Sequence, residues 1–225
     1  MDNNQGMVIV LSGFSGAGKG TIMKHLLSEH PTDYFLSISA TTRGKREGEE
    51  DGREYFFKTR EEFEDMIRNH DLLEYASFNQ NYYGTPKQYV QQLINEGKDV
   101  ILEIEVQGAL QIRKIFPQAL LLFVTPPSGN ILKERLEGRG TEEPEVVAQR
   151  LAIASRESLL MEQYDYIIVN DDLDKAVSYV HELIQSEHGR TMRNTQLIDR
   201  IQNELAVFAK GDVKSFIPLI WNLWK

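Results

Sequence analysis

A glycine-rich segment near the N-terminus combines residue types that bind phosphate groups. It reads Gly13-Phe14-Ser15-Gly16-Ala17-Gly18-Lys19-Gly20-Thr21. Glycines let backbone N–H groups approach phosphate oxygens without a clash from Cβ atoms, and a helix that begins here adds the positive end of its dipole. Lys19 would place a positive charge between the β- and γ-phosphates of a nucleoside triphosphate. The segment therefore predicts a phosphate-binding loop, or P-loop, with Gly13 to Thr21 as ATP-binding residues.

The residue after the P-loop lysine departs from the usual pattern, which has Ser or Thr there to bind Mg²⁺. Here Gly20 follows Lys19, and the hydroxyl comes one position later, at Thr21. This variant resembles nucleoside monophosphate kinases. We expect Mg²⁺ to enter as Mg-ATP, held mainly through phosphates and water, and the sequence assigns it no direct protein ligand. The alternative, a glycine-rich turn that binds nothing, is disfavoured by Lys19 and by the apolar run before the loop.

A second group of charged and aromatic residues lies between Ser37 and Tyr89. Its motifs are Ser39–Gly48, Asp51–Phe57, Leu73–Ala76 and Asn81–Thr85. Taken singly, each has a structural interpretation, because basic residues among acids usually lie in a solvated loop and tyrosines are frequent in strands. Farther along, Glu103 and Glu105 are two positions apart and would project to one face of a strand. Two like charges on one face cost free energy unless a cationic or donor-rich group lies there; the alternative is a solvent-exposed pair.

These motifs, in this order, resemble those of the guanylate kinase family, and the resemblance covers about Met7 to His188. It implies ATP-dependent phosphorylation of GMP to GDP in purine nucleotide metabolism; whether dGMP is a second acceptor stays open. It also implies the residues of the GMP site. Arg43, Arg46, Tyr55 and Tyr83 would hold the phosphate, and Ser39, Glu74 and Thr85 would face the guanine edge, with Glu103 and Glu105 as further members of the site.

The chemistry of guanine agrees with that assignment. Its Watson–Crick edge offers N1–H and N2–H₂ donors, and a carboxylate, which only accepts hydrogen bonds, can take both. A site built to accept those donors rejects an analogue without them by ~10⁴-fold or more. Arginines suit the phosphate because each presents a planar fork of donors.

A further set of arginines resembles the lid of the same family. Arg135 and Arg139 are four positions apart on one helix face, a spacing at which like charges destabilise an isolated helix by about 0.2–0.5 kcal/mol unless an anion lies between them. The resemblance implies that Lys19, Arg43, Arg135, Arg139 and Arg150 are catalytic, and that Asn170 lies near the adenine of ATP. The alternative is that neighbouring glutamates neutralise these arginines at the surface.

The elements that must position these residues can be predicted from hydrophobic patterns. Strands are expected at Met7–Leu11, Asp99–Val106, Ala119–Thr125 and Tyr164–Val169. Helices are expected at Lys19–Ser28, Ser128–Glu137, Glu145–Met161 and Asp172–His188. This alternation predicts an α/β fold, a P-loop NTPase parallel sheet with flanking helices.

One region breaks the alternation and predicts a small mixed α+β insertion. It has short β patterns at Glu54–Lys58 and Leu72–Phe78, separated by a helix that opens with a capping box from Thr59 to Glu62. We therefore predict a guanylate kinase domain over 7–188, with its core at 7–36 and 97–188. The GMP-binding insertion spans about 37–90, the helical lid about 135–150, and a C-terminal extension 189–225.

Composition limits the classes of function. The formal net charge is −9, from 34 acidic and 25 basic residues, so nucleic acid and anionic membranes are not expected as partners. The absence of cysteine excludes disulfides, thiol catalysis and thiolate metal sites. No apolar run reaches the length of a membrane span, and the first six residues do not resemble a signal peptide. We therefore expect a cytoplasmic enzyme whose partners are ATP and GMP.

The extension after position 188 falls outside the resemblance. Thr195 to Ala209 has apolar residues at helical spacing, and Ser215 to Lys225 contains two tryptophans. We expect this segment to pack on the domain or to form a homo-oligomer, with a partner protein as the alternative. Two rival functions also stay open: a kinase for another acceptor, and a protein-binding scaffold module. The intact P-loop glycines and Lys19 disfavour the scaffold module.

Overall fold

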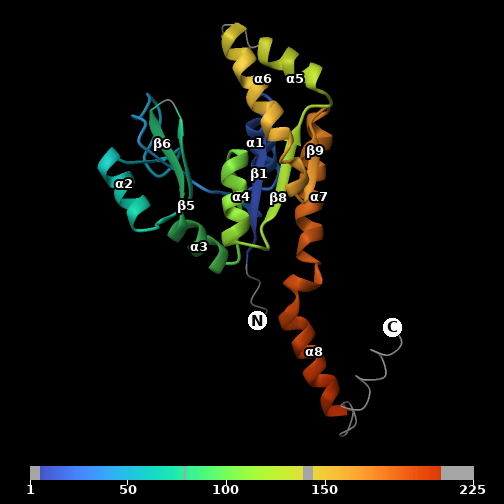
Figure 1. Ribbon diagram of the computed structural model, residues 1–225. Helices are drawn as coiled ribbons and strands as arrows, with labels where there is room; N and C mark the ends of the chain where they lie inside the picture. The colour runs from blue at the N-terminus through green and yellow to red at the C-terminus, as the bar shows by residue number, and fades with distance from the viewer. Residues whose placement is uncertain (1–5, 79, 139–143, 209–225) are drawn as a thin grey trace. The chain divides into compact units, whose positions relative to one another are not determined.

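The computed structural model describes residues 6–78, 80–138 and 144–208, and the chain divides into one compact unit that ends at His181 and another that begins at Glu182. The first unit contains a five-stranded sheet in the order β2-β7-β1-β8-β9, with every neighbouring pair parallel. Its strands β1, β8 and β9 are labelled in Figure 1. Its strands are β1 Val8–Gly13, β2 Tyr34–Leu36, β7 Asp99–Glu103, β8 Leu120–Thr125 and β9 Tyr166–Val169. The predicted parallel α/β fold is confirmed.

Burial explains why the central strands form. All six residues of β1 are buried, and β8 is buried from Leu120 to Val124. Such continuous apolar runs suit parallel strands that are covered on both faces. Val10 of β1 pairs with Leu102 on one side and Leu121 on the other, so the P-loop that follows β1 emerges at the centre of the sheet.

Helices connect these strands. They are α1 Lys19–Glu29, α3 Lys87–Asn95, α4 Val106–Ile115, α5 Gly129–Glu137, α6 Pro144–Ser158 and α7 Leu173–His188. The four predicted helices are confirmed, although the one expected to reach Met161 ends at Ser158 and is followed by a 3₁₀ turn at Met161–Gln163. Ser128 caps α5, because its hydroxyl accepts the backbone N–H of Ile131.

One strand prediction was wrong at its end. We expected a strand from Asp99 to Val106, but β7 ends at Glu103 and α4 begins at Val106. Glu105 occupies the N-cap position of α4 in an extended conformation, with φ −73° and ψ 160°. Glu103 and Glu105 therefore do not share a strand face, and their relation depends on the turn between β7 and α4.

A second, mixed sheet with the order β4-β3-β6-β5 lies in the same unit. Its strands are β3 Ala40–Thr41, β4 Phe56–Phe57, β5 Leu72–Phe78 and β6 Asn81–Pro86. Helix α2, Arg60–Arg68, begins with the predicted capping box between Thr59 and Glu62. The mixed character of the insertion is confirmed; its boundaries as a domain stay a prediction.

The second sheet contacts the first through helix α4. A Cβ atom at Gly108 of α4 would lie 2.9 Å from Oε2 of Glu74 in β5. Glycine at this position leaves room for the Glu74 side chain against α4. The contact fixes the carboxylate of Glu74 near the helix that follows Glu105.

The second unit contains the end of α7, a 3₁₀ turn at Thr191–Arg193 and α8, Thr195–Phe208. Glu187 is buried and pairs with Arg190 at 3.2 Å and with Arg193 at 3.5 Å. The predicted helix over Thr195–Ala209 is confirmed as far as Phe208; Ser215–Lys225 lies outside the described residues. Among the helices that are described, none is long and apolar enough to cross a membrane.

Candidate active site

The P-loop between β1 and α1 has the backbone that its glycines predict. Gly13, Gly16 and Gly18 have φ values of +141°, +90° and +93°, a region that other residues rarely adopt. Space is also limited, because a Cβ atom at Gly18 would lie 2.3 Å from Nδ2 of Asn170. The loop therefore requires glycine at position 18 both for its conformation and for the approach of Asn170.

Lys19 folds back over the loop. Its Nζ donates hydrogen bonds to the carbonyl oxygens of Gly13 at 2.7 Å and Phe14 at 3.3 Å. The ring of Phe14 is 8% exposed and packs edge-on against Phe123, with 4.9 Å between ring centroids. The aromatic contact therefore anchors the part of the loop that holds the Lys19 ammonium group.

Two side chains from later in the sequence reach the same loop, and a third contacts one of these two residues. Asn170, which follows β9, donates from Nδ2 to the carbonyl oxygen of Ala17 at 2.8 Å. Arg135 of α5 donates to the carbonyl oxygen of Asn170 at 2.9 Å, and Arg150 of α6 donates to the hydroxyl of Ser15 at 3.2 Å. The structure thus brings Lys19, Arg135, Arg150 and Asn170 together, as the ATP-site prediction requires. Arg139 lies outside the described residues.

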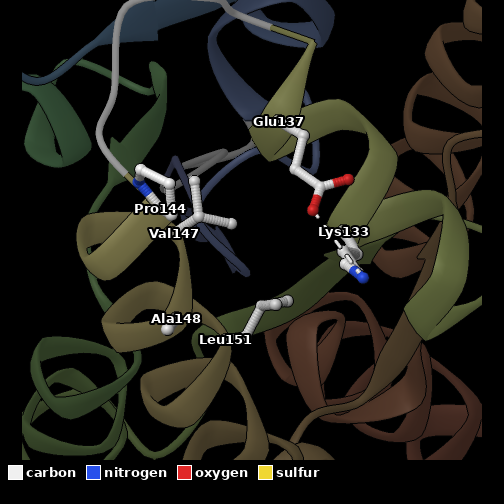
Figure 2. A pocket seen from close by; sticks show the side chains of 6 residues that line it. All are labelled: Lys133, Glu137, Pro144, Val147, Ala148 and Leu151. Atoms are coloured by element: carbon white, nitrogen blue, oxygen red, sulfur yellow. Dashed lines mark ion pairs between the residues drawn. The ribbon is translucent and has the colours of Figure 1, made fainter.

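A pocket of about 340 Å³ lies between α5 and α6, apart from these contacts (Figure 2). It is lined by Lys133, Glu137, Pro144, Val147, Ala148 and Leu151. Lys133 and Glu137 form an ion pair of 3.7 Å at its edge. None of the predicted site residues lines it, so the pocket belongs to the lid helices and not to the site described here.

The predicted phosphate residues of the acceptor site gather around Arg43. The Arg43 guanidinium carbon lies 5.2 Å from the ring centroid of Tyr55, and the rings of Tyr55 and Tyr83 are 6.1 Å apart. Burial raises the pKa of the Tyr55 hydroxyl, so this group stays a hydrogen-bond donor at neutral pH. Arg46 is exposed; its backbone N–H donates to the carboxylate of Glu49.

The predicted guanine residues lie on the paired strands β5 and β6. Thr85 donates from its hydroxyl to Oε1 of Glu74 at 2.7 Å, and the two residues are 1% and 7% exposed. Burial raises the pKa of the Glu74 carboxyl, and the charge of Glu105 adds to that effect. A buried carboxylate with spare lone pairs is the acceptor that guanine donors need. Ser39 is half-buried beside β3, and its carbonyl oxygen accepts the N–H of Phe56.

Three further carboxylates connect the acceptor residues to the P-loop. Glu103 lies beside Gly20, with its Oε1 3.6 Å from the position that a Cβ atom would take there. Burial raises the pKa of Glu103, and the charge of Lys19 opposes the shift. The charge of Glu105 affects carboxyl groups near the acceptor residues and near the P-loop. It raises the pKa values of Glu74, Glu103 and Glu157. The structure thus places Glu103 by the P-loop and Glu105 between the two sites.

Glu49 and Glu157 are two residues of the site that sequence reasoning missed. Burial first, and the charge of Glu105 second, raise the pKa of Glu157 to about 7. Glu157 is seven positions after Arg150, two turns along α6, so both side chains lie on one face of that helix. This spacing from Arg150 is the sequence signal by which Glu157 could have been found. Glu49 directly follows Gly48, so its signal was the motif that also contains Arg43 and Arg46.

Comparisons with known proteins agree with this geometry. The guanylate kinase family model matches residues 5–187. The chain is 52% identical over 193 residues to a guanylate kinase of Bacillus anthracis, covering 86% of this chain and 94% of the relative. It is 51% identical over 191 residues to a guanylate kinase of Streptococcus thermophilus (strain CNRZ 1066), covering 85% and 91%.

A solved structure supports the same relationship. The crystal structure of guanylate kinase from Anaplasma phagocytophilum superimposes with a TM-score of 0.67 at 30% identity, covering 86% of this chain and 92% of that chain. The fold and the family that the sequence motifs predicted are both confirmed. The chain therefore belongs to the guanylate kinase family of P-loop nucleoside monophosphate kinases.

Proposed function

We propose that this chain transfers the γ-phosphoryl group of Mg-ATP to GMP and releases GDP and ADP. The observation that carries the proposal is the pair of sites in one unit. Lys19 and Arg150 donate to the P-loop, and Arg135 donates to Asn170, which itself donates to that loop. Arg43, Tyr55 and Tyr83 meet at the second sheet, which also carries the buried Glu74. A phosphoryl donor and a guanine-bearing acceptor are what these two groups of side chains suit.

The acceptor needs alignment more than activation. The phosphate of GMP is mostly dianionic at neutral pH, with a second pKa near ~6, so its oxygen can attack without a general base. Arg43 and the hydroxyls of Tyr55 and Tyr83 would orient that phosphate, and Glu74 and Thr85 would hold the guanine. Catalysis then depends on positioning and on neutralising charge on the transferred group.

The donor side supplies that neutralisation. Lys19 would exchange the carbonyl oxygens of Gly13 and Phe14 for phosphate oxygens, which are charged and accept stronger hydrogen bonds. Arg135 and Arg150 would turn from the loop to the γ-phosphate, together with Arg139. Closure of the lid around the nucleotides would exclude water and suppress ATP hydrolysis.

The residues near Gly20 fit a magnesium ion. The carboxylate of Glu103 lies next to the start of α1, and carboxylates are ligands that Mg²⁺ accepts alongside phosphates and water. We propose that Glu103 binds this ion directly or through water, although its sequence pattern placed it in the GMP site. Glu103 would help to hold the ion, which would supply positive charge against the phosphates of ATP.

The C-terminal extension is proposed to form a homo-oligomer. The apolar side chains of Leu197, Ile201, Leu205 and Phe208 follow one stripe of α8 and are exposed within its unit. Sedimentation or light scattering on the full chain, and on a chain that ends at His188, would test this. A full chain that stays monomeric up to about 100 μM would refute it.

The experiment that tests the proposed function follows ADP release by the purified chain with ATP and Mg²⁺. Acceptors are GMP, dGMP, AMP, CMP and UMP, and a Lys19→Met variant is the control for contaminating kinases. We expect turnover with GMP that exceeds turnover with AMP by at least ~10³-fold. Equal turnover with AMP, or none with any acceptor in a folded chain, would refute the proposal.

A further inference from the structure

The loop between β3 and β4 closes on itself through one carboxylate. The backbone N–H of Glu49 donates to the carbonyl oxygen of Arg46 at 3.2 Å, and Gly48, the third residue of that turn, has φ +83°. A positive φ at the third position is typical of a type II turn and favours glycine. The turn directs the side chain of Glu49 back toward Arg43.

Glu49 binds two parts of the loop at once. Its Oε1 accepts from Nη2 of Arg43 at 2.8 Å, and its Oε2 accepts from Nη1 of Arg43 at 3.0 Å and from the backbone N–H of Arg46 at 2.8 Å. The Arg43 and Glu49 side chains are only 15% and 17% exposed. Bidentate pairs of this kind fix geometry as well as charge.

Counting the N–H donors of the Arg43 guanidinium shows which edge of the group is already occupied. A guanidinium has five N–H donors. Two go to Glu49, and a second from Nη1 goes to the carbonyl oxygen of Gly44 at 2.8 Å. The Nε–H and the other Nη2–H form the second edge of the plane, and no residue in the described part of the chain takes them. That edge is a second fork of the kind that binds phosphate.

Aromatic rings set the plane of the guanidinium. Its central carbon lies 5.2 Å from the ring centroid of Tyr55 and 5.8 Å from that of Phe57. Tyr55 is a proposed phosphate ligand, and its ring packs against that of Tyr83. With one edge held by Glu49 and the plane held by the rings, the guanidinium has little freedom to rotate.

We propose that Glu49 is a positioning residue of the acceptor site, which holds Arg43 so that its Nε–Nη2 edge faces the phosphate of the nucleoside monophosphate. The inference rests on the proposed function. Glu49 does not touch the acceptor; it acts through Arg43. Its negative charge opposes phosphate binding by Coulomb repulsion, so the benefit must come from the fixed geometry, because a free arginine side chain loses rotamer entropy when it binds.

Equilibrium binding of GMP and guanosine tests this role without relying on catalysis. Guanosine lacks the phosphate, so it reports on the guanine site alone. For Glu49→Gln, whose amide can replace only one acceptor oxygen, we expect the Kd of GMP to rise roughly tenfold and that of guanosine to change less than twofold. In steady state the KM for GMP should rise similarly, with the KM for ATP unchanged. Glu47→Gln, an equal charge change at an exposed position of the same loop, should leave all four values within twofold.

An Arg43→Ala background distinguishes action through Arg43 from a general effect on the loop. There, Glu49→Gln should no longer weaken GMP binding, because the group that it positions is gone. Thermal unfolding of every variant checks that the domain stays folded. Because Glu49→Gln is isosteric, we expect this variant to stay folded.

Three results would overturn the inference. Tighter GMP binding by Glu49→Gln would mean that Glu49 competes with the phosphate for Arg43. An equal loss of guanosine affinity would mean that Glu49 only maintains the fold. An undiminished effect in the Arg43→Ala background would mean that it acts elsewhere. Failure of the proposed function would instead appear in the unaltered chain, as no preference for GMP over guanosine and no phosphorylation.

Discussion

Replacing Glu74 with glutamine should separate stability from activity. Glu74 is 7% exposed, and its carboxyl has a raised pKa because burial disfavours the charged form. The folded state therefore binds more protons than the unfolded state above the ordinary carboxyl pKa, and stability falls as pH rises through that window. Glu74→Gln removes the buried charge, so the variant should unfold at a higher temperature than the unaltered chain at pH 8, and the difference should shrink at pH 5.

The same change should nearly abolish use of GMP. The carboxylate can accept from both N1–H and N2–H₂ of guanine, whereas a glutamine has one acceptor oxygen and presents N–H donors to the other guanine donor. The loss is one charge-assisted bond, about 1.5–3 kcal/mol, and one unsatisfied buried donor, about 1–3 kcal/mol. Together these give roughly 2.5–6 kcal/mol, a fall in kcat/KM for GMP of about 10²–10⁴-fold.

The assay follows ADP release at varied GMP concentration, with calorimetry at pH 5 and pH 8 on the same preparations. Glu47→Gln is the matched control, since it removes an exposed carboxylate from the same unit. A Glu74→Gln variant that keeps kcat/KM for GMP within threefold of the unaltered chain would refute the guanine assignment. A variant that is less stable at pH 8 would refute the claim that the buried charge costs stability.

Two further predictions follow from the P-loop and the lid. Gly18→Ala should destabilise the fold by about 1–3 kcal/mol, because φ is +93° and the new Cβ would lie 2.3 Å from Nδ2 of Asn170. Gly44→Ala is the control, since a Cβ there would have no atom within 4 Å; its free energy of unfolding, measured by thermal unfolding, should stay within about 0.5 kcal/mol of that of the unaltered chain. Because burial and Glu105 raise the pKa of Glu157 from 4.5 to about 7, stability should fall as pH rises between these values, by at most about 3 kcal/mol. Glu157→Gln should flatten that pH dependence in denaturant titrations; an unchanged slope would contradict the shift.

The central sheet and the P-loop were predictable because their signals are local. A strand buried on both faces is a continuous apolar run, as in β1 and β8, and the glycines of the loop directly follow β1. Strand β2, Tyr34–Leu36, could not be predicted in the same way. It has three residues with a buried, a half-buried and an exposed position, and its pairing with β7 joins residues more than sixty positions apart.

The acceptor site was predictable only as a set of motifs. The sequence order identified Arg43, Tyr55, Tyr83, Glu74 and Thr85, and the structure places each near at least one other member. The partners that fix them come from tertiary geometry. Glu49 reaches Arg43 because of a turn. The relation between Glu103 and Glu105 was misjudged because β7 ends at Glu103, before the alternation of faces could apply to Glu105.

The hydrogen-bond partners that the cationic groups have in this structure explain how a chain of net charge −9 can bind two anionic nucleotides. Lys19 and Arg135 donate to neutral backbone carbonyls. Phosphate oxygens are stronger acceptors than any of these, so exchanging partners on binding ATP favours the nucleotide. Arg43 differs because it donates to the carboxylate of Glu49. It can bind a phosphate only through the edge of its guanidinium that Glu49 does not contact. We therefore expect the proposed donor site to gain affinity by exchanging partners, whereas the proposed acceptor site would gain it by keeping one.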